Sequence, residues 1–193
     1  MLAHLLQHLA AAGKVIQVHA PREAAAKLSS LRPRAVLVTT SAIAAPSSEA
    51  ALTALQAYVR GGGRAVFCGL FSSMINQPDF GAFWRKWGLP WTFGDYHRTT
   101  VVLNPARHPA LGGLASPVSI SMKAVHAKGG ALESEIYITT PASSIESLVF
   151  SPDCAHDLSQ SPVLFASVGS GYVGYVGDVN AEPGGTPIVL AMC

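Results

Sequence analysis

The chain has 193 residues, enough for one ordinary domain, and its hydrophobic content of 49% is ample for one continuous core. Charged residues make up only 12%, about half of the roughly 25% that is usual, and the formal net charge is +2. No segment gathers basic side chains, so we expect no nucleic-acid partner. Because no apolar run is long and unbroken enough to span a bilayer, and no secretory leader is visible, we expect no membrane association either.

The three cysteines form no C-x-x-C pair, and a domain of this size does not need disulfides to fold. A reducing, intracellular compartment fits this usage best. We therefore expect a cytoplasmic protein.

The first third of the chain alternates helix-like and strand-like segments. The expected helices span residues 2–12, 21–31 and 47–60, and the expected strands span residues 15–19, 35–39 and 64–68. The apolar run at 35–39 shows no alternation, which is typical of a strand buried on both faces of a parallel sheet. Regular alternation of this kind predicts an α/β fold with right-handed crossovers.

The remainder is less regular. We expect a helix near residues 79–87, short strands at 99–103, 118–125 and 132–138, a hairpin at 163–176 around Gly169-Ser170-Gly171, and a last helix from 186. We interpret residues 99–150 as a β-rich insertion within a single domain spanning 1–193. Both ends of the chain look abrupt, which suggests a domain excised from a longer polypeptide.

Two segments carry a family resemblance. Residues 58–69 run from a helix end through three glycines and a strand to a turn at Cys68, and residues 169–178 combine G-x-G, a strand and Gly-Asp. Together they resemble the class I glutamine amidotransferase-like superfamily, particularly its trehalose-utilisation-like branches. The resemblance implies a three-layer, flavodoxin-like fold with a mainly parallel sheet. Cys68 matches the nucleophile position, but no histidine follows in residues 177–182, so it implies a member that does not hydrolyse glutamine.

Polar residues follow the expected parallel strands at the point where each strand ends. In an open parallel sheet, ligands bind beyond these carboxyl ends, so we expect these side chains to form the rim of a site. The alternative is that they cap helices and close turns. The candidates are Thr40, Ser41, Cys68, Gly69, Ser72, Asp178, Asn180 and Glu182.

Cys68 also allows a catalytic interpretation. A thiol at a strand-to-helix turn feels the positive end of the following helix, which lowers the thiol pKa and favours a nucleophilic thiolate. His97 is the first choice for its base, with Asp95 to orient the imidazole, and His126 and His156 are weaker alternatives. A buried core cysteine is the competing interpretation.

A histidine pair and an aromatic segment each allow more than one interpretation. His4 and His8 share a helix face at a spacing that zinc sites use, but no third ligand stands near them, so we expect no metal and no cofactor. The aromatic residues between Phe80 and Trp91 are either core or a surface for a partner.

Two functions therefore remain open, and a third, a sugar-related enzyme like the trehalose-utilisation relatives, rests on fold analogy alone. The first is a module that binds a small molecule or a protein partner, and the second is a Cys68-dependent hydrolase of an amide or ester. Whether the protein is an enzyme stays open at this stage.

Overall fold

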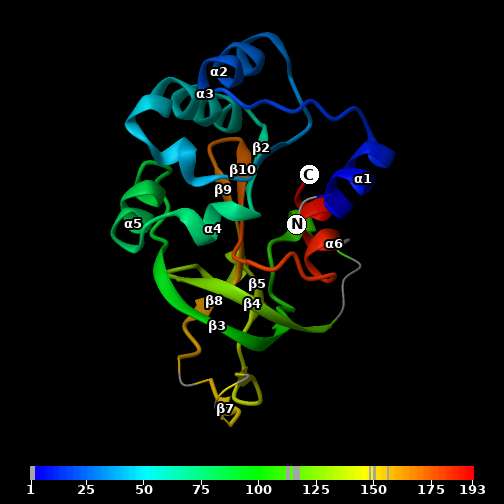
Figure 1. Ribbon diagram of the computed structural model, residues 1–193, viewed down its shortest axis with the longest axis vertical. Helices are drawn as coiled ribbons and strands as arrows, with labels where there is room; N and C mark the ends of the chain where they lie inside the picture. The colour runs from blue at the N-terminus through cyan, green and yellow to red at the C-terminus, as the bar shows by residue number, and fades with distance from the viewer. Residues whose placement is uncertain (1–2, 112–113, 115–117, 148, 150, 156) are drawn as a thin grey trace.

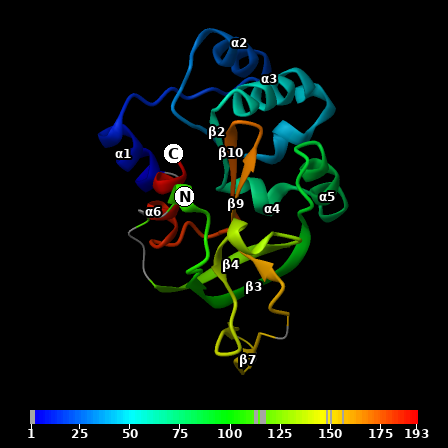
Figure 2. The same ribbon diagram turned by 180° about the vertical axis from the view of Figure 1, so that it is seen from behind.

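A computed structural model describes residues 3–111, 114, 118–147, 149, 151–155 and 157–193. Its sheet stands between two groups of helices, with α3, α4 and α5 on one side and α1 and α6 on the other, and β3, β4 and β7 lie toward the far end (Figure 1). The view from behind shows the same separation (Figure 2). The helices are α1 (Ala3–Ala12), α2 (Pro21–Ser30), α3 (Glu49–Arg60), α4 (Leu70–Met74), α5 (Gln77–Arg85) and α6 (Gly185–Met192). The strands are β1 (Val36–Val38), β2 (Arg64–Phe67), β3 (Thr92–Leu103), β4 (Ser119–Lys128), β5 (Glu135–Ile138), β6 (Ser144–Glu146), β7 (Asp153–Cys154), β8 (Gln160–Ser161), β9 (Val163–Val168) and β10 (Gly171–Val176).

The sheet is mixed, with the strand order β1-β2-β10-β9-β5-β3-β4-β8. Only β1, β2 and β10 run parallel to one another, and β9 pairs antiparallel with β10. Two strands joined by a two-residue turn must be antiparallel, so the Gly169-Ser170 hairpin itself reverses the sheet at this point. The expected α/β class is confirmed, whereas the expectation of a mainly parallel sheet is wrong.

Several expected elements form where the sequence places them. The apolar runs at 35–39 and 64–68 become β1 and β2, and the expected helices at 21–31 and 47–60 become α2 and α3. Residues 15–19 do not form the expected strand; the segment from 14 to 19 is irregular, and Val15 and Ile16 are 39% and 45% exposed. A strand needs a neighbour, and β1, the last strand on that side of the sheet, does not pair with this segment.

The middle of the chain builds the antiparallel part of the sheet. β3 begins at Thr92, ahead of the expected start at 99, and pairs with β4 along most of its length, with an irregularity between Phe93 and Tyr96. This part belongs to the same hydrogen-bonded sheet, because β5 pairs with both β3 and β9. β3 and β4 thereby reach the carboxyl end of β10.

Buried residues form one cluster on each face of the sheet. Trp84, Trp87 and Trp91 are at most 2% exposed and belong to the cluster beneath α3 and α5. Trp84 and Trp87 pack against Phe67, and Trp91 packs against Trp84. The aromatic segment is therefore core, and its interpretation as a partner surface is wrong. The other cluster lies beneath α1 and α6.

Candidate functional site

The turn after β2 is the centre of the candidate site. β2 ends at Phe67, Cys68 and Gly69 form the turn, and α4 begins at Leu70. Gly69 has a φ of 64°, a left-handed conformation that a side chain would disfavour. The Cys68 amide donates to Val38 O (3.0 Å), which ties the turn to the end of β1. The strand, turn and helix expected here are present.

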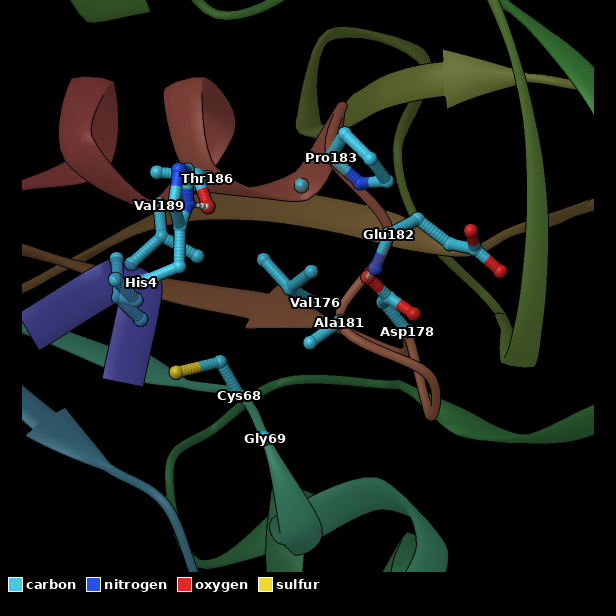
Figure 3. Close-up of a pocket in the computed structure, with 12 residues that line it drawn as sticks. His4, Cys68, Gly69, Val176, Asp178, Ala181, Glu182, Pro183, Thr186 and Val189 are labelled. Carbon is cyan, nitrogen blue, oxygen red and sulfur yellow. Dashed lines mark hydrogen bonds between the residues drawn. The ribbon is translucent and has the colours of Figure 1, made fainter. Parts of the chain in front are cut away.

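A cavity of about 210 Å³ lies between this turn, α1, the end of β10 and the start of α6. Four of the predicted rim residues line it, namely Cys68, Gly69, Asp178 and Glu182. The parallel strands β2 and β10 both end here, so the strand-end rule places the cavity correctly. Figure 3 shows the Cys68 sulfur pointing toward α1.

Asp178 is the buried acid of the cavity wall. Its two carboxylate oxygens accept hydrogen bonds from the backbone N–H groups of Asn180 (2.9 Å) and Glu182 (2.7 Å), which fold the loop back on itself. Ala181, at the bend of this loop, has a φ of 56°. Burial raises the pKa of Asp178 above its usual value, and the two amide donors oppose that shift in part. The sequence identified Asp178 because it directly follows a buried strand.

Glu182 and Asn180 have partners of their own. Glu182 forms an ion pair with Arg98 of β3, and the Asn180 side-chain amide donates to Glu182 Oε1 (3.2 Å). Figure 3 shows the Glu182 side chain pointing away from Cys68. Asn180 does not line the cavity. These contacts help to hold the loop in place.

Cys68 is 2% exposed, and burial raises the pKa of its thiol to about 12, with smaller contributions from the neighbouring Cys193 thiol and Asp178 carboxyl. This shift is opposite to the lowered thiol pKa that the turn position predicts. Desolvation outweighs the helix end because α4 has only five residues and the sulfur lies in an apolar cluster. The thiol stays protonated at neutral pH.

His97, the expected base, does not line the cavity. It lies on β3 opposite Ala124, with its ring centroid 4.6 Å from that of His126. Asp95, expected to orient it, instead accepts a hydrogen bond from the Gln160 side chain (2.5 Å). His97 Nε2 is buried and has no hydrogen-bond partner among the described residues. The structure thus does not bring His97 to the cavity that Cys68 lines. His156 lies outside the described residues.

The other predicted rim residues have structural roles. Thr40 Oγ1 accepts from the Ala42 amide (3.4 Å), and the Ser41 hydroxyl donates to Met74 O (3.0 Å). The Ser72 hydroxyl donates to Gly177 O (3.2 Å) and so joins α4 to the end of β10. None of the three lines the cavity, as the capping alternative predicts.

His4 and Thr186 line the cavity, although no strand-end argument singles them out. Their side chains meet where α1 crosses α6, with His4 Nδ1 and Thr186 Oγ1 3.5 Å apart. They are separated by 182 positions in the chain. The apolar stripe of α1 indicated that this helix is packed, but the sequence could not indicate against which element.

The described residues contain neither a cluster suited to a metal ion nor a helix suited to a membrane. No three His, Cys, Asp or Glu side chains converge in a way that could hold a metal ion. His4 and His8 contact each other, with their Nε2 atoms 3.3 Å apart. No described helix is both long and apolar enough to cross a membrane.

Comparison with known proteins places the fold. No protein-family model matches the chain, and no curated protein matches it significantly. The structure is similar to that of a ThuA-like protein from Bacteroides uniformis, with a TM-score of 0.51 and 13% identity over 92% of this chain and 74% of that one. It is also similar to the cytoplasmic protein STM1381 from Salmonella typhimurium, with a TM-score of 0.52 and 13% identity over 97% and 79% of the two chains. This likeness shows the fold alone, and one of the two neighbours is of the ThuA-like kind that the sequence resembles. The sheet of this chain is mixed, whereas the resemblance implied a mainly parallel one.

Proposed function

We propose that this domain binds a small molecule in the cavity between the Cys68 turn, α1 and α6, and that it does not hydrolyse glutamine. The observation that carries the proposal is the position of the cavity at the carboxyl ends of β2 and β10, with the buried carboxyl of Asp178 in its wall. Sites of α/β sheets form at such strand ends because loops there converge without blocking the sheet.

The cavity lining indicates the class of ligand. Most of the wall is apolar, from Leu5, Val176 and Val189, so the ligand has a hydrophobic body. The volume of about 210 Å³ is below the ~300–1,000 Å³ of sites for drug-sized molecules, so the ligand is smaller than those.

The polar groups of the wall, chiefly the Asp178 carboxyl and Thr186 hydroxyl, favour a ligand that donates hydrogen bonds. The buried carboxyl of Asp178 in the wall disfavours an anion, and it adds to the burial that raises the thiol pKa of Cys68. A neutral alcohol or a primary amine with a short apolar body meets both conditions.

Thiol catalysis is less well supported than binding. A hydrolase of the kind weighed above needs a thiolate beside a base, whereas Cys68 is buried with a pKa near 12 and His97 is elsewhere. His4 lines the cavity, but its ring contacts His8 and Thr186. The binding proposal requires no ionised thiol.

Ligand-observed NMR with a panel of small alcohols, amines and matched carboxylates tests the proposal at about pH 7.5. Binding of alcohols or amines is expected, with the carboxylates silent. Val189→Phe fills the cavity and is expected to abolish binding, and Thr186→Val removes one hydroxyl at nearly constant volume and is expected to weaken it.

Ser73→Val is the matched control, because Ser73 is exposed on α4 outside this cavity. Its binding is expected to equal that of the wild type. If no alcohol or amine binds, or if Val189→Phe and the control bind equally well, the cavity is not the site.

A further inference from the structure

His126 is a fully buried histidine in the middle of the antiparallel part of the sheet. Its exposure is 0%, and both ring nitrogens are buried without a hydrogen-bond partner in the described chain. The ring of His97 lies beside it, and His97 Nε2 also has no partner there. A proton added to His126 would therefore meet no acceptor and would place a charge in the core.

The ionisable groups around this pair are already engaged. Asp95 of β3 accepts from the Gln160 side chain, and Lys128, at the end of β4, forms an ion pair with Asp157 (2.6 Å). Since His97 is itself titratable, its protonation would oppose that of His126. Only Asp95 exerts an attraction on a charged His126, and burial outweighs it.

The strand that carries His126 also holds the wall of the cavity. The Val125 amide donates to Gly177 O (3.0 Å), the Val179 amide donates to Lys123 O (3.0 Å), and Ala124 bridges to Asp178. The Tyr175 hydroxyl of β10 donates to Val125 O (2.8 Å). Displacing β4 at residues 123–126 therefore displaces the backbone on either side of Asp178.

We propose that protonation of His126 opens this joint between β4 and residues 177–179, so that the cavity loses its Asp178 wall in mild acid. One part of this inference rests on the proposed function, namely that a ligand bound in the cavity is released as the pH falls. The opening itself requires no ligand.

The size of the effect follows from linkage. Burial lowers the pKa of His126 to about 3, whereas a solvated histidine has a pKa of about 6.5. A lowered pKa gives stability that is complete above about pH 6.5 and is lost as the pH falls toward 3. If the ring reaches water in the open state, the open population rises about thirtyfold between pH 7.5 and pH 5.0.

Amide hydrogen exchange at Val125 and Val179 measures this population directly. Protection factors, which are corrected for the intrinsic pH dependence of exchange, are expected to fall by about thirtyfold in the wild type from pH 7.5 to 5.0. His126→Phe keeps an aromatic ring of similar size but cannot be protonated, so its protection is expected to fall far less than that of the wild type. The half-buried His97, whose pKa burial also lowers, accounts for the fall that remains. His19→Phe alters an exposed histidine and is expected to behave like the wild type.

Three results would overturn the proposal. They are constant wild-type protection at both amides, an equal fall in His126→Phe, or a fall confined to β3 and β8 while Val179 keeps its protection. The wild-type comparison stands by itself should His126→Phe not fold. Because exchange is measured without ligand, its outcome is independent of whether any alcohol or amine binds at pH 7.5.

Discussion

Arg98 and Glu182 form an ion pair that ties β3 to the loop walling the cavity. Both side chains are less than one-third exposed, and Arg98 also donates to the Ser121 hydroxyl (3.3 Å), so the guanidinium is held in place. The pair thus ties the loop that follows Asp178 to β3.

Breaking this pair is expected to loosen the loop. A double-mutant cycle of Arg98→Met and Glu182→Gln, followed by urea unfolding, should give a coupling energy of about 1 kcal/mol, as expected for a partly buried charged pair. The coupling should shrink at high salt. A coupling energy indistinguishable from zero at low salt would show that the two charges are independently solvated.

Cys68 is expected to resist alkylation in the native protein. Its buried thiol, with a pKa raised to about 12, should not react with iodoacetamide at about pH 8, whereas the exposed Cys154 should react. Mass spectrometry of native protein compares the two sites in one sample. Rapid labelling of Cys68 before unfolding would restore the nucleophile hypothesis that its position suggests.

Trp84 is expected to be among the costliest core residues to truncate. Its ring is fully buried against Phe67, Trp91 and Tyr175, so Trp84→Ala should lower the free energy of unfolding by about 3–5 kcal/mol. Trp84→Phe should cost less, since the indole N–H has no described partner to lose. Guanidinium unfolding of both variants measures the difference, and a near-neutral Trp84→Ala would contradict the packing described above.

Gly177 is expected to tolerate no side chain. A Cβ atom there would lie 2.0 Å from Val125 O, so Gly177→Ala must push β4 away from the end of β10. We expect a loss of about 1–3 kcal/mol in the free energy of unfolding. Gly13→Ala is the control, because no atom lies within 4 Å of the added methyl, and its effect should stay within about 1 kcal/mol. Equal effects for the two variants would rule out the close approach.

The sequence predicts local elements well and their partners poorly. The apolar runs that became β1 and β2, and the turn at Cys68, depend on neighbouring residues and were recognisable. Residues 15–19 have a strand-like composition, but a strand also needs a neighbour, which a local pattern does not reveal. The mixed sheet, in contrast, was implicit in the predicted hairpin, because a two-residue turn forces antiparallel pairing.

The candidate site, like the fold, was predictable where it depends on neighbouring residues. Cys68 and Asp178 each lie just beyond the end of a buried strand, and both line the cavity, as the strand-end rule predicts. His97 was placed wrongly because residues alternate along β3, and its side of the strand faces His126. His4 lines the cavity because α1 packs on α6, a long-range contact that a short sequence pattern does not reveal.

The outer edge of β1 has a consequence for how the protein behaves at high concentration. β1 ends the sheet, and in the described part of the chain no strand covers its outer backbone groups. Such an edge is a template for strand addition by another polypeptide, which folded proteins usually guard with proline, charge or a bulge. In this chain a proline and a charged residue, Pro33 and Arg34, stand just before the strand. The Arg34 side chain donates a hydrogen bond to Cys193 O (3.2 Å). Loss of Arg34 is therefore expected to favour association of copies of the protein through this edge.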